Sequence, residues 1–137
     1  MHCSYSTTAI GQFGYEAGPN VYILDQFGLA DPLTARADVS ETGWRLPAGH
    51  RKQLDLEWYA ARFDAPAVLI NREVRPDAVA AARRALACPP LSDLLDAVSE
   101  PLTVGRFLSN VRNSMSFARL RLPIDPLDAR PAPCEPP

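Results

Sequence analysis

The chain has 137 residues, of which 47% are hydrophobic and 22% are charged, and its net charge is −2. These proportions are typical of a globular protein of single-domain size and exclude a disordered chain. The balanced charge gives no drive toward nucleic acid, so we expect no nucleic-acid partner.

Two short runs near the N-terminus predict β-strands. Residues 7–13 and 21–24 are apolar, β-branched or aromatic, and Gly14, Gly18 and Pro19 between them favour a turn. The stretch GQFGYEAG only superficially suggests a nucleotide-binding loop, because its spacing does not match GxGxxG, and we interpret its glycines as turn residues. The second run, VYIL, is apolar throughout and predicts a strand covered on both faces.

Apolar residues at helical spacing predict four or five helices after these strands. The pair Asp31–Pro32 favours a helix start, with an acidic N-cap followed by proline at the first helical position. Residues 55–63 have an apolar face at positions i, i+3, i+4 and i+7. Two further helices are expected to begin at Pro76 and Pro90.

The clearest helical pattern covers residues 103–119. Its apolar side chains form a continuous stripe of Val104, Phe107, Leu108, Val111, Met115 and Ala118. Such a stripe packs into the protein's own core or docks against another element, and the sequence leaves both alternatives open. A helical interaction module that docks through this stripe is therefore one functional hypothesis.

Taken together, the patterns predict an α+β fold with one domain over residues 1–122. Two or three short N-terminal strands would pack with four or five helices, and helices would dominate. Prolines gather in the final segment RLPIDPLDARPAPCEPP, so residues 123–137 are expected to form a mobile tail. No apolar run is long enough to span a bilayer, and the start lacks a signal-peptide pattern, so the chain alone has a cytoplasmic default.

The cysteines and histidines give no metal-ligand spacing, and no cofactor motif is present. Cys3, Cys88 and Cys134 form no CxxC pair. We interpret Cys88 as a small buried apolar residue. The other two cysteines lie near the termini, where one disulfide could form if the domain is exported. We therefore predict neither a metal nor a cofactor.

Two acids flank a glycine turn after the second predicted strand. Asp25 ends the run VYIL, and ligands of open α/β sheets bind at the carboxyl ends of strands. Asp25 is thus a candidate site residue of a stand-alone soluble α/β enzyme or small-ligand binder. It can equally bond backbone amides in the turn at Gly28. Asp31 is a weaker candidate, because its N-cap role already explains it.

The polar loop over residues 39–52 holds three further candidates. Trp44 lies among polar residues, and its ring could stack on a sugar. His50 and Lys52 lie in a piece that could grip an anionic or hydroxyl-rich ligand, although one histidine is a poor metal site. No serine lies in a nucleophile elbow, and no carboxylate pair at helical spacing marks a pocket face, so no catalytic residue is predicted.

Several motifs, taken in order, resemble a known family. They are GYxAGPxV from Gly14, DxxGLxDPLxAR from Asp25, GHxKxL from Gly49, ARF from Ala61, PLTxxRFLxN from Pro101 and FAR from Phe117. This combination resembles the soluble C-terminal region of actinobacterial cell-wall arabinofuranosyltransferases, among them those that add terminal β-(1→2)-linked arabinofuranose.

Members of that family are polytopic GT-C membrane enzymes that use a decaprenyl-phosphate arabinose donor to cap arabinan outside the plasma membrane. The resemblance implies an accessory extracytoplasmic domain, or a truncated form, that assists binding of the arabinan acceptor or the donor. Its partner would be the transmembrane part of the same enzyme. The family's catalytic acid precedes the matched region, so the chain alone is expected to be inactive. The candidate substrate-binding residues are Asp25, Asp31, Trp44, His50 and Lys52.

Overall fold

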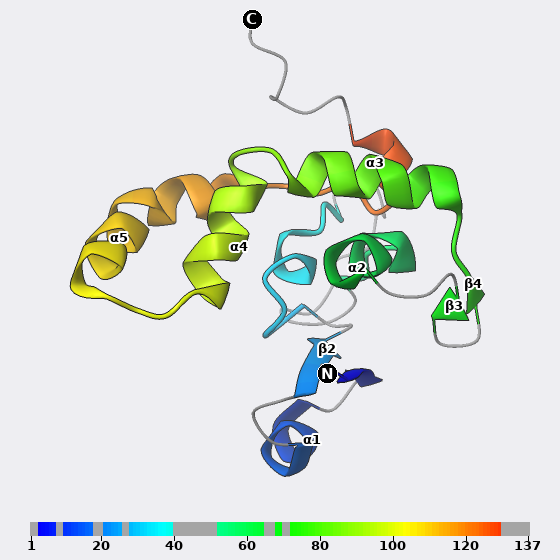
Figure 1. Ribbon diagram of the computed structural model, residues 1–137, viewed down its shortest axis with the longest axis horizontal. Helices are drawn as coiled ribbons and strands as arrows, with labels where there is room; N and C mark the ends of the chain where they lie inside the picture. The colour runs from blue at the N-terminus through cyan, green and yellow to red at the C-terminus, as the bar shows by residue number, and fades with distance from the viewer. Residues whose placement is uncertain are drawn as a thin grey trace, which may run out of the picture. The chain divides into compact units, whose positions relative to one another are not determined.

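The computed structural model describes residues 3–7, 10–17, 21–25, 28–39, 52–64, 68–69 and 72–129. The chain divides into two compact units, Met1–Leu54 and Asp55–Pro137. We expected one domain over residues 1–122 and a tail from residue 123. Instead, residues 123–129 lie within the second unit and include the short 3-10 helix η3 (Pro126–Asp128) (Figure 1).

The first unit begins with a strand, a helix and a strand. Strands β1 (Cys3–Thr7) and β2 (Val21–Asp25) pair in parallel, with Cys3 opposite Val21 and Thr7 opposite Asp25. Parallel neighbours need a crossover connection, and α1 (Ile10–Ala17) supplies it. After β2 the chain turns at Gly28 and forms a single 3-10 turn, η1 (Thr34–Arg36).

The predicted α+β fold class is wrong. Residues 7–13 were expected to form a strand, but most of them lie in α1, so Gly14 is a helical residue rather than part of a turn. The physical reason is visible in the spacing of Ile10, Phe13 and Ala17, which recur at helical intervals. Helices α2 to α5 belong to the second unit, where helices pack on helices, and helix dominates the described residues.

Helices α2 (Leu56–Phe63) and α3 (Pro76–Leu86) form the core of the second unit and begin where the sequence predicted. They lie side by side in Figure 1. The buried face of α3 carries the small side chains of Ala78, Ala82 and Ala85. Small residues at a helix contact let the two axes approach closely. In the chain, β3 (Val68–Leu69) and β4 (Arg72–Glu73) come between α2 and α3, and they form a minimal antiparallel pair.

Residues 123–129, which were expected to be mobile, pack against this core. The fully buried Trp58 donates its indole N–H to the carbonyl oxygens of Pro123 and Ile124, each at 3.2 Å. A buried indole N–H normally finds an acceptor, and these carbonyls provide it. The helix η3 then packs against α3.

Helices α4 (Leu91–Ser99) and α5 (Val104–Arg119) complete the second unit and contact each other (Figure 1). The Thr103 hydroxyl caps α5 by accepting from the backbone N–H of Arg106 at 3.2 Å. Phe117 is the one residue of α5 that is buried. None of the described helices is long and apolar enough to cross a membrane.

Candidate functional site

The carboxylate of Asp25 fixes the turn that follows β2. Asp25 is 1% exposed, and its Oδ2 accepts from the backbone N–H groups of Leu29 at 2.5 Å and Ala30 at 2.8 Å. The carbonyl of Asp25 also accepts from the backbone N–H of Gly28 at 3.1 Å. These bonds give Asp25 a structural role. Whether it also contacts a substrate stays a prediction.

Asp31 caps the next turn, as its sequence predicted. It is 1% exposed, and its Oδ1 accepts from the backbone N–H groups of Leu33 at 3.0 Å and Thr34 at 2.7 Å. The Thr34 hydroxyl donates to the same oxygen at 2.9 Å. The element that follows is the 3-10 turn η1 rather than a longer helix. Capping therefore accounts for the position of this acid.

Lys52 lies beside the same turn. Its Nζ donates to the carbonyl oxygen of Ala35 at 3.0 Å. Gly28 has a φ of +74°, and a Cβ there would come within 2.9 Å of the Thr34 carbonyl oxygen and 3.0 Å of the Lys52 Cβ. Glycine is therefore required twice over, by its backbone conformation and by the close approach of its neighbours.

The structure thus gathers three of the five predicted site residues, Asp25, Asp31 and Lys52, around one glycine turn. The other two, Trp44 and His50, lie outside the described residues. A role of any of the five in substrate binding remains a prediction.

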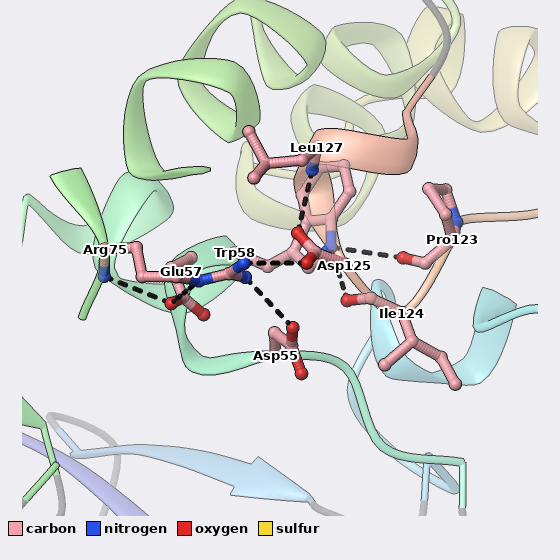
Figure 2. A network of polar contacts seen from close by, with 8 residues as sticks. All are labelled: Asp55, Glu57, Trp58, Arg75, Pro123, Ile124, Asp125 and Leu127. Carbon is pink, nitrogen blue, oxygen red and sulfur yellow. Dashed lines mark hydrogen bonds and ion pairs between the residues drawn. The ribbon is translucent and has the colours of Figure 1, made fainter. Parts of the chain in front are cut away.

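A second polar cluster is centred on Arg75, immediately before α3 (Figure 2). Its backbone N–H and its Nε donate to Glu57 Oε1 at 3.1 and 3.0 Å. Its two terminal nitrogens contact Asp125 Oδ2 at 2.8 Å and Asp55 Oδ2 at 3.3 Å. One guanidinium therefore joins the start of α2, the start of α3 and the start of η3.

The charges in this cluster shift one another's pKa. Burial would raise the pKa of Glu57, but the hydrogen bonds from Arg75 outweigh it and hold that pKa below its usual value. The side-chain hydrogen bond from Arg75 likewise lowers the pKa of Asp125. Burial and the neighbouring Glu57 and Asp125 raise the pKa of Asp55. Because its donors are directed at these acids, Arg75 acts as a structural clamp.

A pocket of about 490 Å³ lies between α4 and α5. Its lining is mainly polar and consists of Asp93, Asp96, Ala97, Thr103, Gly105, Arg106, Ser109, Asn110, Asn113 and Phe117. Arg106 donates to the carbonyl oxygen of Asp96 at 3.0 Å, and Asn110 donates to that of Ala97 at 3.2 Å. These two bonds hold the polar face of α5 against α4 and so fix the shape of the pocket.

This pocket was not predicted from the sequence. No carboxylate pair at helical spacing was expected on a pocket face, yet Asp93 and Asp96 are three residues apart on α4 and both line the pocket. The signal was the polar row of Arg106, Asn110 and Asn113, which recurs at helical spacing on the side of α5 opposite its apolar stripe.

Two further findings limit the chemistry available. No group of three or more possible metal ligands occurs among the residues that the structure describes. Cys88 is disulfide-bonded. Its burial is as expected, but its sulfur is oxidised, which corrects its interpretation as an ordinary small apolar residue.

A known family matches nearly the whole chain. The family model described as the AftB family C-terminal domain matches residues 1–130. A terminal beta-(1->2)-arabinofuranosyltransferase of Mycobacterium tuberculosis is 35% identical over 119 residues, which cover 84% of this chain and 18% of that protein. A protein of the same name from Corynebacterium glutamicum is 34% identical over 110 residues, covering 80% of this chain and 16% of that protein.

The chain therefore spans less than a fifth of the length of these two curated relatives. No solved structure matches it.

Proposed function

The chain belongs to the AftB family C-terminal domain, and from this membership we propose that it serves cell-wall arabinan synthesis as an accessory domain of a membrane arabinofuranosyltransferase. Two curated relatives carry the name terminal beta-(1->2)-arabinofuranosyltransferase. This chain matches only a small part of each. Its task is therefore to hold the arabinan acceptor or the lipid-linked donor, and catalysis belongs to the remainder of the enzyme.

The observation that carries this proposal is the polar pocket between α4 and α5. Its volume of about 490 Å³ lies in the range of small-ligand sites. Sugar hydroxyls both donate and accept hydrogen bonds. They therefore need acceptors such as Asp93 and Asp96 together with side chains that can donate and accept, such as Asn113. Neither carboxylate forms an ion pair with another described residue, and Phe117 adds an apolar edge for the C–H face of a furanose ring.

The turn around Asp25 is a second candidate for substrate contact. Asp25 and Asp31 direct their carboxylates at backbone amides, so a ligand here would meet Lys52. The same bonds argue against a stand-alone enzyme or binder that uses Asp25 at a strand end, because that acid is already buried and hydrogen-bonded. We therefore place the pocket first.

The disulfide at Cys88 supports an extracytoplasmic location for this domain. Disulfides persist in oxidising compartments and are rare in the cytosol. We propose that the domain lies on the outer face of the plasma membrane, where the transmembrane part of the same enzyme is its partner.

Titration of the 137-residue chain with arabinofuranose oligosaccharides, followed by NMR, tests the pocket. We expect the amide signals of α4 and α5 to shift, and Asp96→Asn to weaken binding roughly tenfold, since a hydrogen bond to a charged acceptor contributes about 1.5 kcal/mol or more. Asp77→Asn, which changes an exposed acid on α3, is the matched control and should bind normally.

Two results would count against this assignment. If saturating oligosaccharide left the α4 and α5 signals in place, the pocket would not bind sugar. If the signals of Gly28 and Lys52 shifted instead, the site would lie at the glycine turn.

A further inference from the structure

Helix α5 is oriented in an unusual way in its unit. The residues that it turns toward α4 are polar apart from Phe117: Arg106 and Asn110 bond to carbonyls of α4, and Asn113 lines the pocket. A helix on the surface of a soluble protein normally buries its apolar stripe and exposes its polar face. In α5 the polar face is turned inward.

The apolar stripe of α5 consequently faces away from the unit. Its members Val104, Phe107, Leu108, Val111 and Met115 have exposed fractions between 53% for Phe107 and 79% for Val104. They follow one another at intervals of three and four residues and so form one continuous surface along the helix. Single exposed apolar residues are ordinary, but a row of five marks a contact surface.

The charge beside the stripe is of one sign. The α5 sequence VGRFLSNVRNSMSFAR contains arginines and no acidic residue. Arg112 and Arg119 lie four residues after Leu108 and Met115, so both border the same edge of the stripe. Both are exposed, and neither forms an ion pair among the described residues.

We propose that α5 docks this domain onto the surface of an anionic phospholipid bilayer. The helix lies parallel to the surface, with the stripe at the boundary of the acyl chains and with Arg112 and Arg119 at lipid phosphates. A basic amphipathic helix with large apolar side chains on one face is suited to this location. The flexible arginine side chains can reach the phosphates while their alkyl parts cover apolar surface.

The charge pattern selects a lipid surface over a second copy of the chain. In a symmetric pair of α5 helices, the arginines along the stripe would approach one another without an acidic partner on the helix, and like charges repel. Docking on lipid also leaves the pocket accessible, because the pocket and the stripe occupy opposite faces of α5. This inference is independent of whether the pocket binds sugar.

Flotation of the 137-residue chain with lipid vesicles tests the inference. We expect binding to vesicles of phosphatidylcholine mixed with phosphatidylglycerol, weaker binding to pure phosphatidylcholine, and partial release at high salt. Val111→Ser with Met115→Ser should lower the partition coefficient roughly tenfold or more, since burying a large apolar side chain contributes about 1.5 kcal/mol or more. Arg112→Gln with Arg119→Gln should remove the preference for the anionic vesicles.

Matched controls separate the stripe from general surface changes. Leu127→Ser removes an exposed apolar side chain from η3, and Arg84→Gln removes an exposed arginine from α3. Both should bind vesicles as the parent does, and circular dichroism should find every variant folded. The inference fails if the stripe variant binds vesicles as well as the parent, or if the parent binds neither composition or both equally. A dimer that the stripe variant abolishes, without vesicle binding, would assign the stripe to a second copy.

Discussion

Asp25 was a candidate site residue and Asp31 was expected to cap a helix, but the two acids have the same kind of environment. Each acid is buried and accepts from consecutive backbone N–H groups, Leu29 and Ala30 in one case and Leu33 and Thr34 in the other. Buried backbone donors must be paired, and here the carboxylates pair them. Gly28 between the two acids supplies the left-handed backbone conformation that the turn needs.

Replacing Asp25 tests whether its role is limited to the turn. Asp25→Ala removes the acceptor of two amides and should lower the free energy of unfolding by about 1–2 kcal/mol. Asp25→Asn keeps one oxygen and should cost less. Chemical denaturation measures the loss, and titration with arabinofuranose oligosaccharides should find binding unchanged in the folded variants.

Asp31 provides the comparison for this experiment. Asp31→Ala removes a cap and should also cost about 1–2 kcal/mol, whereas asparagine is nearly as good a capping residue as aspartate. If Asp25→Asn left stability intact but reduced sugar binding, while Asp31→Asn did not, Asp25 would be a contact residue after all.

The cluster around Arg75 predicts how stability depends on pH. Arg75 lowers the pKa of Glu57 from its ordinary 4.5 and that of Asp125 from 3.8. A lowered pKa in the folded state stabilises the protein above the unfolded-state value, and this stabilisation is lost as the pH falls through the folded-state value. The raised pKa of Asp55 acts in the opposite sense and offsets part of the loss. Stability should therefore decline below about pH 4.5.

Arg75→Gln should make this decline shallower, because it removes the groups that lower both pKa values. The measurement is the free energy of unfolding at several pH values from neutral to about pH 3. Arg84→Gln, at an exposed arginine outside the cluster, should keep the parent slope. If the free energy of unfolding of Arg75→Gln declined with falling pH as steeply as that of the parent, acids outside this cluster would cause the loss of stability at low pH.

Residue patterns predicted local contacts better than distant ones. Asp31 was recognisable as a cap because its partners, Leu33 and Thr34, lie two and three residues away. The contacts of Arg75 were not, since Glu57 and Asp125 lie 18 and 50 residues away in the chain. No local periodicity encodes such a distant pair.

At the scale of elements, the helix periods of the second unit were sufficient to place α2, α3, α4 and α5. The sequence of α1 was misread, because β-branched and aromatic residues outweighed a helical spacing that was also present. For α5 the stripe was correctly located, but its orientation was not determined. Periodicity says which residues share a face of a helix and does not say what covers that face.

Phe107 and Phe117 give a direct test of that orientation. Phe107 is 53% exposed on the outer stripe, whereas Phe117 is 8% exposed on the face toward α4. Phe117→Ala should therefore lower the free energy of unfolding by roughly 3 kcal/mol, and Phe107→Ala should leave it almost unchanged. Thermal denaturation of the two variants separates the effects. Equal losses would mean that the stripe is buried within the domain.

At the scale of the whole molecule, the resemblance predicted the family, and the family match confirms it. What the sequence did not reveal was the division into two units and the pocket within the second. Both depend on how helices meet in space. Asp93 and Asp96 on α4 become neighbours of Asn110 and Asn113 only when α4 and α5 pack together.

The two functional proposals fit one helix. The inward face of α5 lines a polar pocket suited to a hydroxyl-rich ligand, and the outward face is suited to a lipid surface. An accessory domain for a lipid-linked donor or a growing glycan would need both properties, because its ligand has to be held close to the membrane. The two faces can be varied separately, so each proposal can fail without the other.

The isolated chain should have no glycosyl-transfer activity. It matches only 18% and 16% of the length of its two curated relatives, so most of each of those proteins has no counterpart in it. Incubation with a decaprenyl-phosphate arabinose donor and a synthetic arabinan acceptor tests this, with the full-length Mycobacterium tuberculosis relative as the positive control. Product should form with the control and not with this chain. Product that formed here and disappeared in Asp96→Asn would make the pocket a reaction centre rather than a binding site.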